Sequence, residues 1–186
     1  MEIVNINAEL RTELGKKGAK KYKADDVVPG VIYGIDTQIS FYAKPLDLRG
    51  LVYTGDFKIC QITVGGKTYK CILKAKQFHP VTDRLVHLDL LLLTEGHPVK
   101  VDLPLRFTGV SPGVKAGGKF LAKVRTVKVK TLPERLVAQL TADISEMGLG
   151  NTIRIKDIKS IDGVEIMSSP NIPVASIEIP RALKGK

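Results

Sequence analysis

Short stretches in which apolar and polar residues alternate follow one another along most of this chain. Alternation with a period of two is typical of strands that bury one face, and turn-forming residues separate these stretches. We expect strands in the first half at 2–10, 31–33, 39–43, 57–64, 67–75 and 85–93. In the second half we expect them at 99–107, 120–130, 135–140, 152–155, 164–167 and 174–179. The pattern therefore predicts a mainly β protein.

Three local signals refine this picture in the first half. Pro45 can start a short helix over 45–53, and Gly55 follows its end. Pro29 and Gly30 predict a turn before a buried strand. Gly65 and Gly66 predict a two-residue hairpin turn, which would place Cys60 directly opposite Cys71. For two cysteines in a reducing compartment, buried thiols are favoured over a disulfide.

A turn-rich segment at 94–98 predicts a domain boundary at midchain. We expect a first domain over 1–94, a linker over 95–98, a second domain over 99–181 and a basic tail over 182–186. The second domain is expected to be all-β, either a sandwich or a barrel, because its short strands are closely spaced between turns. A glycine-rich and proline-rich loop is expected over 109–118.

Composition and charge narrow the class of partner. The chain has 186 residues, is 44% hydrophobic and carries a net charge of +10. Residues 1–94 hold 14 Lys or Arg against 10 Asp or Glu, so both halves are basic. This charge suits a protein that lies against nucleic acid. We expect no signal peptide and no membrane span, and therefore a cytoplasmic location.

The densest basic segment, residues 11–23, is the first candidate binding element. Its glycines at 15 and 18 disfavour a long regular helix and permit close approach of the backbone to a ligand. Such a segment either binds a polyanion or is a solvated arm. Its basic residues are Arg11, Lys16, Lys17, Lys20, Lys21 and Lys23.

Enzyme chemistry finds little support in the sequence, and no cofactor or metal site is expected. Residues 113–119 match a phosphate-binding loop up to its Lys, but Phe120 stands where Ser or Thr is needed. His87 and Asp89 lie two apart on a strand and so share a face. They can contact the minor groove of RNA or form an ordinary surface hydrogen bond. Tyr33 can anchor a core edge or contact a ribose or phosphate.

Several segments in fixed order resemble one family of bacterial ribosomal proteins. INAELR at 6–11, the Gly-Lys basic cluster, PGVIYG at 29–34, QFHP at 77–80 and HLD at 87–89 resemble the twenty-fifth protein of the large subunit, which binds 5S ribosomal RNA. VDLPLRFTGVSPGVKAGG at 101–118, DISEMGLGNTIRIKDI at 143–158 and GVEIMSSPNIPVASI at 163–177 resemble its long form, the general stress protein Ctc type.

The resemblance implies an N-terminal β-barrel with short helices and a C-terminal β-domain. It also implies a structural role in the large subunit, with 5S rRNA and neighbouring ribosomal RNA and proteins as partners and no small-molecule substrate. The matching RNA-facing residues are Arg11, Lys16, Tyr33, His87 and Asp89, with Gln77 and His79 nearby. The alternative is a stress-related module that binds RNA or protein off the ribosome.

One departure from the family lies in the basic segment. The family usually carries Ser-Arg-Arg followed by Leu-Arg, where this chain has KKYK at 20–23. Arg binds phosphate in a bidentate manner, whereas Lys acts as a point charge. The electrostatic role of this segment is therefore expected to persist, but not its individual contacts.

Overall fold

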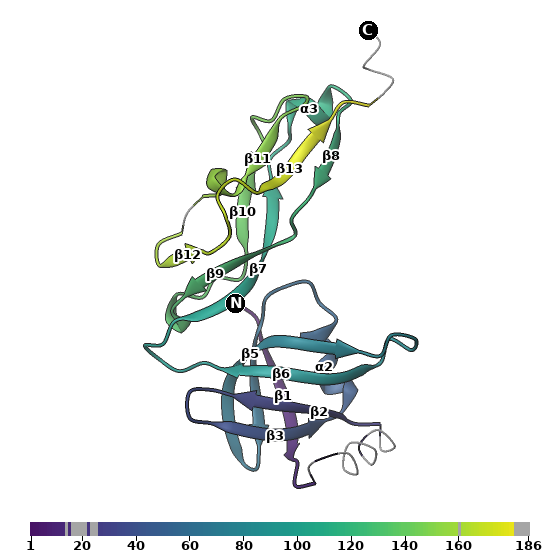
Figure 1. Ribbon diagram of the computed structural model, residues 1–186, viewed down its shortest axis with the longest axis vertical. Coiled ribbons are helices and arrows are strands. Elements are labelled where there is room, and N and C mark those ends of the chain that lie inside the picture. The colour runs from purple at the N-terminus through teal and green to yellow at the C-terminus, as the bar shows by residue number, and fades with distance from the viewer. Residues whose placement is uncertain (14, 16–21, 23–25, 160, 181–186) are drawn as a thin grey trace. The chain divides into compact units, whose positions relative to one another are not determined.

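The computed structural model describes residues 1–13, 15, 22, 26–159 and 161–180. The chain divides into two compact units, Met1–His97 and Pro98–Lys186 (Figure 1). The predicted basic tail at 182–186 lies outside the described residues. No helix in the described part of the chain is long and apolar enough to cross a membrane.

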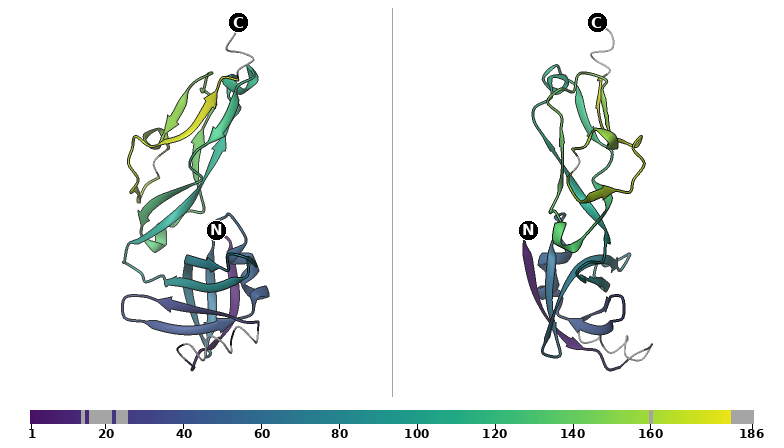
Figure 2. Two further views of the ribbon diagram at one scale, coloured as in Figure 1. Left: turned by 45° about the vertical axis from the view of Figure 1, so that its right-hand side comes forward. Right: turned by 90° about the vertical axis from the view of Figure 1, so that its left-hand side faces the viewer.

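The first unit is a closed six-stranded barrel in the order β1-β3-β2-β6-β5-β4. Figure 2 shows two further views of the ribbon. Parallel pairing of β1 with β4 and of β2 with β6 joins its antiparallel pairs into a closed sheet. A short helix, α2, follows β3. The bounds are β1 Ile3–Leu10, β2 Val28–Tyr33, β3 Gln38–Ala43, α2 Pro45–Val52, β4 Ile59–Val64, β5 Lys67–Phe78 and β6 Leu85–Leu92.

The barrel core follows from the alternation in the sequence. Ile32, Phe41 and Leu90 point inward from β2, β3 and β6 and are fully buried. Leu48 and Val52 of α2 join the same core, which fixes the helix against the barrel. The predicted hairpin is confirmed, since Val64 pairs with Lys67 and Cys60 with Cys71. Both cysteines are buried free thiols.

The turn predicted at Pro29 and Gly30 is wrong, because both residues lie inside β2. Gly30 pairs with Phe41 of β3 and with Leu88 of β6. A Cβ added to Gly30 would lie 2.5 Å from Phe41 Cζ and 2.8 Å from the Leu88 carbonyl oxygen. Glycine is needed here for close packing of the inner face, not for a turn.

The second unit contains two sheets with the orders β10-β7-β9-β12 and β11-β13-β8. Neither is a closed barrel in the part of the chain that the structure describes. The bounds are β7 Val99–Thr108, α3 Pro112–Lys115, β8 Lys119–Ala122, β9 Thr126–Thr131, η1 Pro133–Arg135, β10 Leu140–Asp143, β11 Thr152–Arg154, η2 Ile155–Asp157, β12 Val164–Ile166 and β13 Pro173–Glu178.

Two strand predictions for this unit are wrong. Residues 120–130 form two strands in different sheets, because Lys123 and Val124 both donate their N–H groups to Val174 O and the chain then leaves that sheet. Residues 135–140 are mostly irregular, and the strand begins only at Leu140. The alternation within β9 is nevertheless correct, since Val127 and Val129 are buried and Lys128 is exposed.

The predicted loop at 109–118 contains the short helix α3. Ser111 caps it by accepting hydrogen bonds from the N–H groups of Gly113 and Val114. A Cβ on Gly113 would lie 2.6 Å from the Gly148 backbone, and one on Gly118 would lie 2.5 Å from Ile177 Cγ2. These two glycines therefore permit close packing of the backbone. This packing explains the glycines of a loop whose sequence resembles a phosphate-binding motif.

Candidate nucleic-acid interface

Strand register places polar and aromatic side chains on one outer face of the barrel. Tyr42 pairs with both Glu9 and Pro29. Pro29 precedes the Gly30–Leu88 pair and so lies beside His87, which in turn pairs with Gln77 of β5. A second row runs across the same strands through Ser40, Val31, Asp89 and Ala75. We call these two rows, together with Tyr33, the outer face.

His87 and Asp89 form a close pair on the outer face, with His87 Nδ1 2.9 Å from Asp89 Oδ1. Their side chains are 27% and 32% exposed. The Nδ1 atom is itself buried and has no aligned hydrogen-bond partner among the described residues. The contact is thus a close approach of two polar groups rather than a well-directed hydrogen bond. Both side chains keep exposed surface for a further partner.

Tyr33 lies on the outer face, one pleat beyond the Val31–Asp89 pair, and is half-buried outside the barrel core. Burial raises the pKa of its phenol above the usual value of 10.0, and the nearby Asp89 carboxylate raises that pKa further. The phenol therefore stays protonated near neutral pH and can donate a hydrogen bond.

A cluster that the sequence analysis missed joins the basic segment to the outer face. The Tyr22 ring packs against the Tyr42 ring with centroids 5.0 Å apart, and the Arg11 guanidinium lies 5.2 Å from the Tyr22 centroid. Tyr42 donates a hydrogen bond to Glu9, and Tyr22 is only 7% exposed. We call Arg11, Tyr22, Tyr42 and Glu9 the tyrosine clasp. Its one sequence signal is an aromatic residue within a lysine-rich run.

The remaining predicted residues divide into two groups. Gln77 is exposed on the outer face opposite His87. His79 lies at the start of the β5–β6 connection, where its Nδ1 accepts the N–H groups of Val81 and Thr82 at 3.3 Å each. Five predicted phosphate-binding residues lie outside the described residues: Lys16, Lys17, Lys20, Lys21 and Lys23.

The outer face and the tyrosine clasp together present an arginine, aromatic rings, an imidazole and carboxylates. The described residues contain no group of three or more His, Cys, Asp or Glu side chains able to hold a metal ion. A β-barrel with a polar and aromatic outer face of this kind is typical of a binding protein.

Comparison with known proteins identifies the class. Residues 6–90 match the model of the ribosomal L25p family, and residues 98–181 match the C-terminal domain of ribosomal protein TL5. The large ribosomal subunit protein bL25 of Cytophaga hutchinsonii is 40% identical over 99% of this chain and 95% of its own length. The bL25 proteins of Porphyromonas gingivalis and Phocaeicola vulgatus are 36% and 32% identical over all of this chain and 97% and 96% of their own lengths.

These matches place the chain among the structural proteins of the large ribosomal subunit. Within that class it belongs to the ribosomal L25p family, in the form with a second, TL5-type domain. The predictions of a ribosomal protein, of a mainly β fold and of a non-enzymatic role are confirmed. Association with the ribosome follows from the same membership.

Proposed function

We propose that the first unit binds 5S ribosomal RNA through the outer face and the basic segment, and so helps to hold the central protuberance of the large subunit together. The main support is that strand register gathers Tyr33, His87, Asp89 and Gln77 on one face. The tyrosine clasp joins the basic segment to that same face.

The two elements divide the work of recognition. Lysines 16, 17, 20, 21 and 23, with Arg11, neutralise phosphates, which positions the protein without reading sequence. His87, Asp89 and Gln77 contact base edges and ribose hydroxyls in the wide, shallow RNA minor groove. The protonated Tyr33 phenol donates a hydrogen bond to a ribose or phosphate oxygen beside them.

A substitution at Asp89 can distinguish base and ribose contacts from phosphate contacts, because a carboxylate near RNA is repelled unless it accepts a hydrogen bond. Asp89→Ala should weaken binding to 5S RNA more than binding to an unrelated duplex RNA. Filter binding of the full chain to both RNAs measures the ratio, with exposed Asp36→Ala outside the outer face as control. Equal loss on both RNAs contradicts the proposed role of Asp89.

The chain is proposed to act in the cytoplasm on the assembled large subunit, where the second unit contacts neighbouring ribosomal RNA or protein. Sedimentation of a cell extract tests this most directly. The protein should migrate with the large subunit, and a chemical footprint of the pure protein on 5S RNA should map a bounded site. Persistent absence from the large subunit would favour the alternative of a stress-related module that acts off the ribosome.

A further inference from the structure

A groove of about 480 Å³ opens at the end of the barrel, between the start of β2, α2 and the β5–β6 connection. Its volume lies within the range of about 300–1,000 Å³ typical of small-ligand sites. The walls are mainly apolar and include Val28, Pro29, Pro45, Leu85 and Val86. None of the interactions described above for the outer face occupies this groove.

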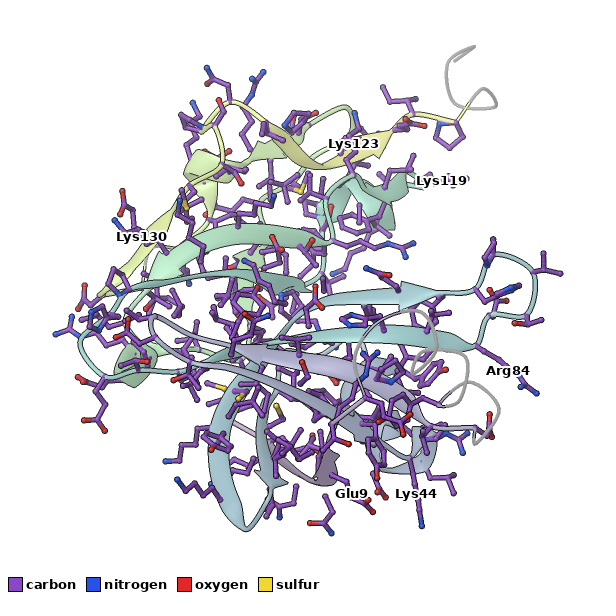
Figure 3. All side chains as sticks on the ribbon, turned by 60° about the horizontal axis from the view of Figure 1, so that its bottom comes forward. Glu9, Lys44, Arg84, Lys119, Lys123 and Lys130 are labelled. Atoms are coloured by element: carbon purple, nitrogen blue, oxygen red, sulfur yellow. The ribbon has the colours of Figure 1, made fainter. Side chains whose placement is uncertain are left out.

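Three polar or aromatic groups line the groove among these apolar walls. Tyr53 is 58% exposed, and its ring packs against Phe78 with centroids 5.8 Å apart. His79 Nδ1 accepts two backbone N–H groups, so the proton of the neutral imidazole sits on Nε2. The Arg84 guanidinium lies 3.7 Å from the Asp26 carboxylate, and both side chains are about three-quarters exposed. Figure 3 shows Arg84 extending away from the ribbon at the β5–β6 connection.

The β5–β6 connection holds these groups in fixed places. His79 donates its N–H to Arg84 O at 2.8 Å, and Asp83 donates its N–H to His79 O at 3.0 Å. With the two bonds to His79 Nδ1, these contacts close residues 79–84 into a compact turn. The His79 donor is therefore positioned before any ligand arrives, which lowers the entropic cost of binding, and the backbone of Arg84 is held beside it.

This combination matches the way proteins hold single unpaired bases. Such bases stack on aromatic rings or apolar surfaces and accept or donate hydrogen bonds at their edges, while a cation contacts the adjoining phosphate. An aliphatic side chain of a protein partner would fill the apolar walls but would leave the His79 Nε2–H without an acceptor. The groove also adjoins the outer face, because Pro29 belongs to both.

We propose that this groove is a nucleobase site, in which one unstacked base of the bound RNA packs against Tyr53 and accepts a hydrogen bond from His79 Nε2. Arg84 contacts the phosphate beside that base. The inference rests on the proposed binding of 5S RNA. It adds a second mode of recognition, in which a single extruded base binds beside the outer face that contacts the RNA minor groove.

Because the sequence contains no Trp, the fluorescence of a single introduced Trp reports on its own surroundings alone. Tyr53→Trp keeps an aromatic platform and introduces one Trp, whose emission should be quenched when a base stacks on it. Tyr53→Ala removes the platform. Leu46 is 76% exposed on α2, the helix that Tyr53 directly follows, and does not line the groove, so Leu46→Trp and Leu46→Ala are matched controls. The full chain is titrated with 5S RNA in each case, and circular dichroism verifies the fold.

Tyr53→Trp should still bind 5S RNA and lose emission on binding, whereas Leu46→Trp should bind without quenching. Tyr53→Ala should weaken binding at least about fivefold, the lower bound for one base on one aromatic ring. Normal 5S binding by Tyr53→Trp without quenching, or by Tyr53→Ala without loss, overturns the nucleobase site. Should Tyr53→Ala bind 5S RNA normally but fall off purified large subunits, the groove binds a protein instead. Failure of the parent protein to bind 5S RNA would overturn the proposed function itself.

Discussion

Tyr22, an aromatic residue within the basic segment, packs against Tyr42 of the barrel and against Arg11. An isolated run of lysines has no apolar group to hold it against a folded surface, and ordering it costs about 1–2 kcal/mol of backbone entropy per residue. Packing of the Tyr22 ring between Arg11 and Tyr42 offsets part of that cost. Arg11 and Tyr22, two members of residues 11–23, are thereby held at the outer face.

Removing the Tyr22 ring should therefore weaken both folding and RNA binding. An aromatic pair and a cation–π contact contribute together about 1–2 kcal/mol, so Tyr22→Ala should lower the free energy of unfolding by about that amount. Binding to 5S RNA should weaken about tenfold, because Tyr22 no longer contacts Arg11 and Tyr42 at the outer face. Urea denaturation and a binding titration measure the two effects. Tyr22→Phe is the matched control, and equal losses in both variants would contradict a role for ring packing.

The coupling between Tyr33 and Asp89 predicts a measurable titration shift. Burial and the Asp89 charge both raise the pKa of the Tyr33 phenol. Asp89→Asn removes the charge and leaves the burial, so the pKa of Tyr33 should fall but stay above 10.0. Because the folded pKa exceeds the unfolded one, the contribution of Tyr33 to stability is complete below pH 10 and is lost as pH rises through the folded pKa. A ¹³C NMR titration of labelled tyrosine checks the shift, and an unchanged pKa would disprove the coupling.

The residues of the candidate site were predictable to different degrees. His87 and Asp89 lie two apart on one strand, so their shared face follows from strand geometry alone. Tyr22 and Tyr42 are twenty residues apart, and their contact depends on where the chain returns to the barrel. No local pattern carries that information. The groove around Tyr53 was equally hidden, because three separate elements of the barrel form it.

At the scale of elements, Gly30 illustrates why local turn signals can mislead. The Pro-Gly dipeptide indicates a turn in isolation, but the core needs an inward position without a side chain beside Phe41 and Leu88. The Gly65-Gly66 hairpin was predictable because its positive φ angles of 57° and 80° are demanded locally. Packing decided the conformation at Gly30, and local backbone preference decided that of the Gly65-Gly66 pair.

Gly30→Ala should accordingly destabilise the barrel. Its Cβ would overlap the Phe41 ring and a backbone oxygen, and such overpacking costs about 1–3 kcal/mol. Gly50→Ala within α2 is the control: its Cβ meets only Val4 at 3.8 Å, and alanine favours a helix over glycine by about 1 kcal/mol. Urea denaturation should show opposite shifts, and a neutral Gly30→Ala would contradict the packing argument.

The turn after β10 predicts a local acid response in the second unit. Asp143 accepts hydrogen bonds from the side chain and the backbone N–H of Ser145, which lower the pKa of its carboxyl below the usual 3.8. Its contribution to stability is thus present above pH 3.8 and lost as pH falls through the lowered pKa. Ser145→Ala should raise this pKa toward its ordinary value. Carboxyl ¹³C NMR measures it, and a pKa that stays equally low would assign the effect to the backbone N–H of Ser145 and the charge of Lys159.

At the scale of the whole molecule, basic residues occur in both halves of the sequence, but some lysines of the second unit lie beside acidic residues. On the four-stranded sheet of the second unit, Lys130 Nζ lies 4.0 Å from Glu165, and Lys128 pairs in register with Asp102. The count of 29 Lys and Arg residues therefore overstates how much cationic surface is available to phosphates. The sequence alone could not reveal this, because Lys128 and Lys130 read as one basic run until the register supplies their acidic neighbours.

The salt dependence of 5S RNA binding should distinguish the lysines of the basic segment from Lys128 and Lys130 of the second unit. Each phosphate contact contributes a slope of about 0.7–0.9 in the logarithm of affinity against the logarithm of salt concentration. Four contacts from the basic segment predict a total slope of about −3. If Lys20 and Lys21 each bind a phosphate, Lys20→Gln with Lys21→Gln should flatten it by about 1.5.

Lys128→Gln with Lys130→Gln removes the same charge from the second unit and should leave the slope for isolated 5S RNA unchanged, because the proposed contacts to 5S RNA all lie in the first unit. Titrations of the full chain between about 50 and 200 mM salt span a sufficient range. Equal flattening by both double variants would show that binding follows net charge alone. A flattened slope only for the second-unit variant would move the phosphate contacts to the sheet that carries Lys128 and Lys130.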